Sequence, residues 1–292
     1  MDETAAGSVS VTSAPFTEAL ALRLRSDDQS GTQNYVATLG TAWTIGPKAH
    51  GGLLLALCAN AARHALGAQS ADVQPLAVSA NYLSPPEPGE VELSTVLRRR
   101  GRTVSLVDVE LCQGGRSAVR ATVTLGPAES GVAAFEREHP MQSMSVAPPA
   151  DAVDVSAHAL GKIVHVATVC ELRVDPASAA FLRGEVGADP AIRLWVKPMG
   201  EAPDALFALM AGDVSPPVTL NLGRLGWAPT VQLTALLRGR PAPGWLRVQM
   251  STSKVGATWF DGDATVIDAN GALVCQARQL ALAPAKPRVE AS

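Results

Sequence analysis

Asp213, Thr230 and Gln279 are polar residues at places in the second half of the chain where the sequence pattern calls for apolar ones. Asp213 falls on one helical stripe with Leu209 and Met210, so a carboxylate lies at the end of a face that should be covered. A half-buried carboxylate needs partners or a raised pKa, and a general base uses both. The same aspartate could simply end the helix and cap the next turn, and its spacing leaves both interpretations open.

Gln279 shares a predicted strand face with Cys275, Ala277 and Ala281. A buried amide without a partner is costly, so we expect polar company for it. The alternative is a glutamine that bonds an exposed backbone edge. Thr230 opens the first long strand of the same region and is a weak signal by itself, because threonine is common in strands.

The stretch His50-Gly51-Gly52 precedes a predicted helix in the first half of the chain. Paired glycines let a ligand approach the backbone, and free N–H groups at a helix start favour an anionic or carbonyl oxygen. We therefore predict a substrate-binding role for His50, Gly51 and Gly52. A plain tight turn before the helix is the alternative.

The elements that would hold these residues follow from hydrophobic periodicity. Apolar residues at helical spacing predict one enclosed helix over 53–66, after a strand over 35–45. The second half repeats this order, with a helix over 203–212 that begins at Pro203 and Asp204. Its earlier strands are expected over 163–174, 180–186 and 192–196.

A stretch of four strands occurs twice, over 76–126 and over 230–282. Gly89 corresponds to Gly244 and Gly101 corresponds to Gly256, and in both pairs the second glycine comes 155 positions after the first (244 − 89 and 256 − 101). In the last hairpin the offset grows by one residue, which lies in the turn, so equivalent side chains stay on the same face of the sheet. With this offset, Gln279 corresponds to Val123. A repeat of this length predicts two domain-sized halves of one design.

Each half is thus one buried helix followed by a meander of long antiparallel strands, and a sheet curled around the helix would cover it on all sides. The predicted class is α+β, and the arrangement resembles a tandem, or double, hotdog fold. We place the first hotdog at 14–127, a linker at 128–157, and the second hotdog, with the polar residues above, at 158–286.

The composition bears on the size of the core, on the class of binding partner and on the location of the protein. The 292 residues are 47% hydrophobic and 17% charged, enough for a substantial core, and a net charge of −3 gives no basic stripe for nucleic acid. The acidic Asp2 and Glu3 argue against a signal peptide, and no apolar stretch is long enough to cross a bilayer, so we expect a cytoplasmic protein. The four cysteines are interpreted as small core residues: Cys58, Cys112, Cys170 and Cys275.

Familiar catalytic motifs are missing. The sequence has no G-x-S-x-G elbow, no Walker loop, no GxGxxG and no HExxH, and its five histidines are spaced too irregularly for a metal site. We therefore expect neither a metal nor another cofactor.

The residues singled out above resemble the acyl-CoA thioesterase II family, the TesB-like double hotdog thioesterases, over most of the chain. His50-Gly51-Gly52 with the helix that follows is similar to the Gly-Gly helix entry of that family. Tyr82-Leu83-Ser84-Pro85 and Arg98-Arg99-Arg100-Gly101-Arg102 resemble its strand and Arg-Gly turn.

Three positions of the second half match the catalytic set of that family: Asp213, Thr230 and Gln279. The resemblance implies hydrolysis of acyl-CoA to fatty acid and CoA. Asp213 would be the general base, Thr230 and Gln279 would position the water, and a helix-start N–H near Gly52 would polarise the carbonyl. The family often has Asp-His after its Thr or Ser and an apolar residue at position 50. Here Val231-Gln232 and His50 stand there, which bears on substrate more than on reaction type.

Two other functions fit the same fold. A hotdog hydratase or dehydratase needs a His-Asp pair, and no His-x-x-x-Gly-x-x-x-x-Pro stretch follows the first strand. A non-catalytic acyl-CoA-binding protein would keep the pocket without the chemistry, and the three polar residues speak against it. Association into a homo-oligomer is open.

Overall fold

A computed structural model describes residues 13–27, 31–67, 72–129 and 131–285. The start of the chain, where the acidic residues argued against a signal peptide, lies outside the described residues. Within them, no helix is both long enough and apolar enough to span a membrane.

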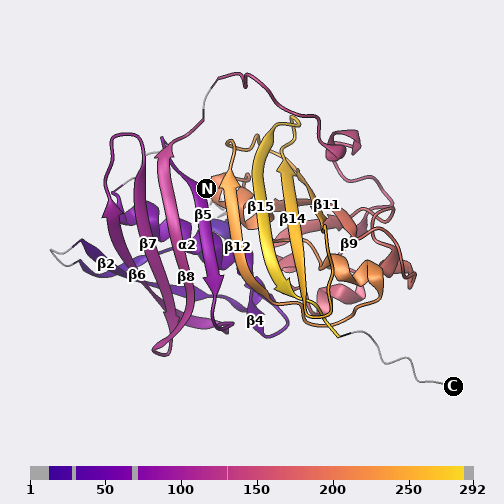
Figure 1. The fold of residues 1–292 in the computed structure, drawn as a ribbon, viewed down its shortest axis with the longest axis horizontal. Coiled ribbons are helices and arrows are strands. Elements are labelled where there is room, and N and C mark those ends of the chain that lie inside the picture. The colour runs from indigo at the N-terminus through magenta and orange to yellow at the C-terminus, as the bar shows by residue number, and fades with distance from the viewer. Residues whose placement is uncertain (1–12, 28–30, 68–71, 130, 286–292) are drawn as a thin grey trace, which may run out of the picture.

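One antiparallel sheet of 13 strands dominates the described residues, in the order β1-β2-β6-β7-β8-β5-β12-β15-β14-β13-β11-β10-β9 (Figure 1). The strands are β1 Arg23–Asp27, β2 Thr32–Leu39, β5 Val73–Tyr82, β6 Gly89–Arg99, β7 Ser105–Gln113, β8 Arg116–Pro127, β9 Val153–Asp154, β10 Cys170–Val174, β11 Ala191–Pro198, β12 Thr230–Leu237, β13 Leu246–Ser251, β14 Trp259–Ile267 and β15 Leu273–Leu282. A small hairpin, β3 Thr44–Ile45 with β4 Lys48–Ala49, leads into the first long helix.

The two halves of the sheet have the same strand order. The first reads β1-β2-β6-β7-β8-β5. The second reads β10-β11-β13-β14-β15-β12, with the two-residue β9 as an extra strand at its outer edge. Equivalent positions also pair equivalently, because Val78 lies opposite Val123 and Leu233 lies opposite Gln279. The sequence repeat and the double hotdog predicted from it are confirmed.

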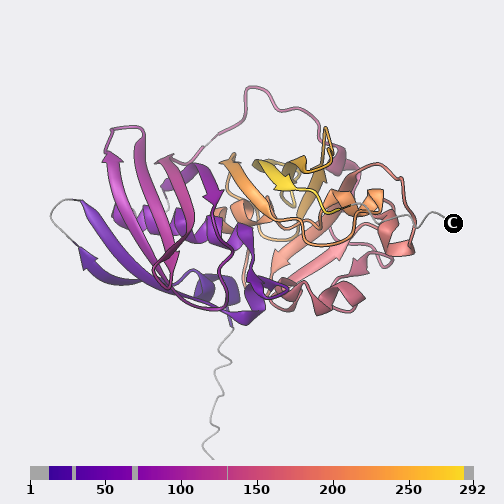
Figure 2. The same ribbon diagram turned by 60° about the horizontal axis from the view of Figure 1, so that its bottom comes forward.

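A helix lies against the sheet in each half, and α2 can be followed beneath the strands of the first half in Figure 2. Helix α2 (Gly51–Ala65) is apolar around most of its circumference, and ten of its residues are buried. Helix α3 (Ala205–Ala211) is shorter, and all seven of its residues are buried. Alternating strand residues such as Val107, Val109 and Leu111 face the helices and complete the core.

The halves join where β5 pairs antiparallel with β12, from Asn81 opposite Gln232 to Ala77 opposite Leu236. Helix α1 (Pro15–Ala19) also crosses between them, because the carboxylate of Glu201 accepts the backbone N–H of Phe16 at 2.8 Å. The Phe16 ring then packs edge-on against Phe207 of α3.

Three predicted strands differ from the structure. The segment 163–174 is a strand only from Cys170, and 180–186 is not a strand. The strand predicted over 35–45 is interrupted, because β2 ends at Leu39 and only Thr44–Ile45 is again a strand, β3. Apolar residues in these segments lie in short 3-10 turns instead, and the N–H of Gly46 donates to the carbonyl of Ile163 at 2.7 Å. The 3-10 turns in these segments are Thr41–Trp43, His165–Thr168 and Ala180–Arg183. The other 3-10 turns of the described residues are Pro140–Ser143, Ala159–Lys162 and Val218–Leu222.

Candidate active site

Asp213 follows the end of α3 in the second half and lies against the start of α2 in the first. The N–H of Gly52 donates to its carboxylate. A Cβ built on Gly51 would lie 2.6 Å from Oδ2 of Asp213, and one on Gly52 would lie 2.6 Å from the carbonyl oxygen of Met210. The glycine pair therefore permits the close approach of the two helices that brings the carboxylate to a helix start.

Burial raises the pKa of Asp213 from its ordinary value to about 7, and the hydrogen bond from Gly52 opposes that rise. The residue as a whole has intermediate exposure, whereas its carboxyl group is enclosed by protein. A carboxylate with a pKa near neutrality can take a proton from water and release it again during turnover.

His50 is the N-cap of α2 and is only 4% exposed. Its Nδ1 accepts the N–H of Leu53 at 3.2 Å, so the ring proton is on Nε2. The ring donates a hydrogen bond to the backbone carbonyl of Asp213. Burial lowers the pKa of His50 to about 4, so the imidazole is neutral at physiological pH. It joins the start of α2 to the end of α3.

Tyr82, the last residue of β5, also holds the start of α2. Its hydroxyl donates to the carbonyl of Gly51 at 2.9 Å. Burial, and then the charge of Asp213, raise the pKa of this phenol well above its usual value. Sequence reasoning gave Tyr82 no part in the site, because a tyrosine that ends a strand is unremarkable until the fold brings a second segment to it.

Thr230 and Gln279 are joined directly. The Thr230 hydroxyl donates to Oε1 of Gln279 at 2.6 Å, between the adjacent strands β12 and β15. Gln279 is 9% exposed, and Thr230 is half-buried. The polar company expected for the Gln279 amide is thus found.

Helix α3, which ends just before Asp213, packs on β15, the strand that carries Gln279. A Cβ on Gly212, the residue before Asp213, would lie 3.0 Å from Cβ of Ala277 and 3.4 Å from Sγ of Cys275. Ala277 and Gln279 are alternate residues of β15 and point to the same face of the sheet. The candidate site therefore draws its groups from α2 and β5 of one half and from α3, β12 and β15 of the other.

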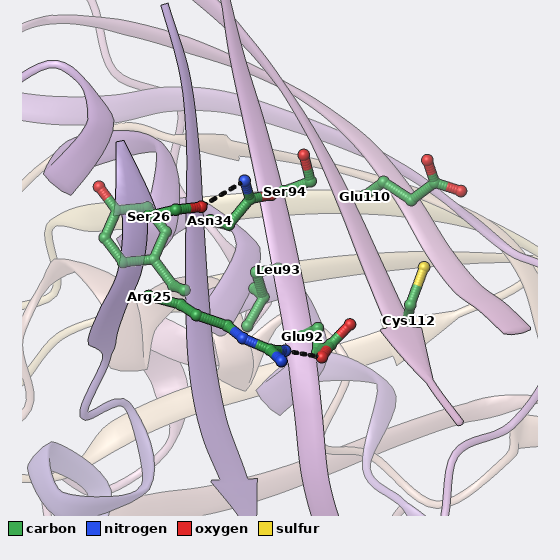
Figure 3. Close-up of a pocket in the computed structure, with 9 residues that line it drawn as sticks. Arg25, Ser26, Asn34, Glu92, Leu93, Ser94, Glu110 and Cys112 are labelled. Atoms are coloured by element: carbon green, nitrogen blue, oxygen red, sulfur yellow. Dashed lines mark hydrogen bonds and ion pairs between the residues drawn. The ribbon is translucent and has the colours of Figure 1, made fainter. Parts of the chain in front are cut away.

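A separate depression of about 490 Å³ lies near the outer edge of the first half (Figure 3). Arg25 and Glu92 in its wall form an ion pair, and Asn34 donates to Ser26 at 3.0 Å. Cys112, the only cysteine that is not fully buried, also lines it. The depression contains none of the predicted site residues. Among the described residues, no group of three or more potential ligands is arranged to hold a metal ion.

The fold and the site together define a double hotdog protein with an acid, a hydroxyl and an amide in its second half. Family models match both halves of the chain. The acyl-CoA thioesterase N-terminal domain matches residues 39–126, and the acyl-CoA thioesterase C-terminal domain matches residues 143–283. The chain belongs to the acyl-CoA thioesterase family and is a thioester hydrolase.

Similar proteins and solved structures match more than nine-tenths of this chain. An uncharacterised protein of Mycobacterium tuberculosis is 46% identical over 289 residues, which cover 93% of this chain and 99% of the relative. A Thermobifida fusca crystal structure, provisionally described as a thioesterase II, is 27% identical with a TM-score of 0.79, and covers 92% of this chain and 97% of its own. An Alicyclobacillus acidocaldarius structure described as a hot dog fold shares the fold at 21% identity, with a TM-score of 0.75 and coverage of 93% and 98%.

Proposed function

We propose that the chain hydrolyses acyl-CoA to a free fatty acid and CoA with a water molecule held by Asp213, Thr230 and Gln279. The observation that carries this proposal is the position of Asp213. Its carboxylate lies at a helix start, and burial raises its pKa to about 7. That combination suits a general base working near neutral pH.

Hydrogen-bond capacity assigns a role to each group. The proton of the Thr230 hydroxyl is already donated to Gln279, so Thr230 can only accept from the water. The amide N–H of Gln279 can donate to the water oxygen. The water would give one hydrogen to Asp213 and the other to Thr230, which leaves one oxygen lone pair for attack.

The reaction then balances as follows. The water oxygen forms a bond to the thioester carbonyl carbon while its proton moves to Asp213. The tetrahedral intermediate collapses with cleavage of the carbon–sulfur bond, and Asp213 returns the proton to the sulfur of CoA. The helix-start N–H of Gly51 would stabilise the negative carbonyl oxygen, because the N–H of Gly52 already donates to Asp213.

Within the proposed substrate-binding stretch, His50 has a positioning role. Both of its ring nitrogens have protein partners, Leu53 and Asp213. We propose that it fixes the helix start against which the substrate carbonyl lies, while Gly51 and Gly52 provide the surface that the substrate contacts.

The proposal includes three points that rest on sequence reasoning: a cytoplasmic location, acyl-CoA rather than nucleic acid as the partner, and the division into 14–127, 128–157 and 158–286. Assembly into a homo-oligomer is compatible with it.

The test replaces Asp213 by asparagine, which keeps the shape but cannot take the proton. A matched control is Asp204→Asn, because Asp204 caps the start of the same helix and asparagine caps equally well. Thiol release from acyl-CoAs of several chain lengths should fall at least ~100-fold in Asp213→Asn. Asp204→Asn should keep the native rate.

Undiminished thiol release in Asp213→Asn would refute the general base. Tight acyl-CoA binding without thiol release by the native protein would favour the binding-protein alternative. Water addition to an enoyl-CoA would favour the hydratase.

A further inference from the structure

We propose that Gly262 is a positioning residue whose missing side chain creates the space in which the Gln279 amide lies. This inference rests on the proposed function, because it concerns how one of the three water-binding groups is held.

The contacts around Gly262 are close. It lies opposite Gln279 in the pairing of β14 with β15. A Cβ at position 262 would lie 3.0 Å from both Cγ and Nε2 of Gln279, and 3.1 Å from Sδ of Met250. Contacts this short force neighbouring atoms to move, and Gln279 is the neighbour on two of the three.

Backbone geometry does not explain this glycine. Gly262 is in the middle of β14, its φ is not positive, and the irregularity of that strand pair lies further along, between Val266 and Ile267. Glycine inside a strand weakens the strand relative to alanine, because the unfolded chain is more flexible at glycine. A strand interior with glycine often marks a site of close approach, and here the approaching group is the Gln279 amide.

The first half of the chain has the same two positions with different residues. There Val107 lies opposite Val123, and both are fully buried. Going from that half to the other, Val123 corresponds to the larger Gln279 while Val107 corresponds to Gly262. The space gained at one position is occupied by the amide at the other, so the glycine and the glutamine form a complementary pair.

The functional consequence concerns Thr230. The 2.6 Å bond from its hydroxyl holds Oε1 of Gln279, and Gly262 leaves room for Nε2 on the other side of the amide. A methyl group at position 262 would displace the amide and disturb that bond. Misplacing a group that orients the attacking water slows the chemical step, whereas substrate binding is little affected.

The experiment is a double-mutant cycle with Gly262→Ala, Gln279→Ala and the pair, measured as kcat and KM for thiol release, with Tm for each variant. Gly262→Ala should lower kcat about tenfold with KM nearly unchanged. In the Gln279→Ala background it should cause no further loss, because the amide it displaces is gone. Val107→Ala, at the equivalent position of the first half, is the control for a general loss of stability and should keep the native kcat.

Native kcat in Gly262→Ala would overturn the inference, and so would an equal loss of kcat in both backgrounds. If Gly262→Ala fails to fold while the double variant folds, the clash with Gln279 is demonstrated and the inference stands. If both fail to fold, it falls. A native rate in Gln279→Ala alone would instead refute the role of Gln279 in the proposed function.

Discussion

The two halves of the molecule share a fold but differ at the three positions that we propose hold the water. His50 and Asp204 cap equivalent helices 154 positions apart, which places Asp213 at the equivalent of Ala59. Thr230 corresponds to Pro75, because each precedes a register shift in the strand that joins the halves, β12 or β5. Gln279 corresponds to Val123. The acid, hydroxyl and amide of one half thus correspond to Ala59, Pro75 and Val123, all buried, in the other.

Under the proposed function, the two halves therefore have complementary tasks. The second half carries the polar groups, whereas the first half contributes the helix start with His50, Gly51 and Gly52. The equivalent start in the second half has Ala205 and Leu206, where side chains replace the glycine pair. Each half has therefore kept what the other lacks.

The largest expected effect comes from erasing one difference. Gln279→Val copies Val123 into the second half and removes the amide that would donate to the water. We expect thiol release to fall roughly 100-fold, because a water without that contact is poorly oriented. Circular dichroism should show an intact fold. A variant within twofold of the native rate would contradict the role of the amide.

The next prediction compares variants of the two helix N-caps, His50 and Asp204. His50→Asn retains a good N-cap, but the shorter side chain cannot reach the Asp213 carbonyl. We expect kcat to fall about tenfold with little change in KM, since the base would be less firmly placed. The matched variant Asp204→Asn should be unaffected. Equal rates in the two variants would show that the contact between His50 and Asp213 has no role in turnover.

The smallest effect is on stability, and its sign is opposite to that on activity. The pKa of Asp213 is about 7 in the folded chain, above its ordinary value of 3.8, so the folded chain binds the proton more tightly than the unfolded chain. The resulting stabilisation is complete below pH 3.8 and is lost as the pH rises through 7. Asp213→Asn, which stays neutral, should therefore unfold at a higher temperature than the native chain at pH 8.

The gap should close as the pH is lowered towards 4. Its size is at most roughly 4 kcal/mol, for about three pKa units. Thermal melts of both proteins between pH 4 and 8 provide the measurement. A gap that does not change with pH would mean that the carboxylate is not strained by burial.

Much of the fold could be predicted from the sequence because its signals are local. Alternation along 231–237 and the paired glycine turns predict strands from neighbouring residues alone. The segments 163–169 and 180–186 were predicted wrongly because short 3-10 turns also bury apolar residues in quick succession. The β5–β12 pairing has no local signal, since it depends on how two distant hairpins meet.

The candidate site was predictable to a similar extent. Asp213 and Gln279 interrupt apolar faces, so the pattern itself marks them. The contacts of Asp213 with Gly52 and His50 join different halves, and no spacing along the chain encodes them. Gly262 did leave a signal, a glycine within an alternating strand, but its meaning depends on what lies opposite.

The seam between β5 and β12 also bears on why the half without the acid, hydroxyl and amide persists. Expressed alone, either half would present a long strand with unsatisfied amide and carbonyl groups, which is a template for aggregation. Each half thus pairs with the exposed edge strand of the other. If the gene is divided at the linker, we expect folded protein only when both fragments are produced together.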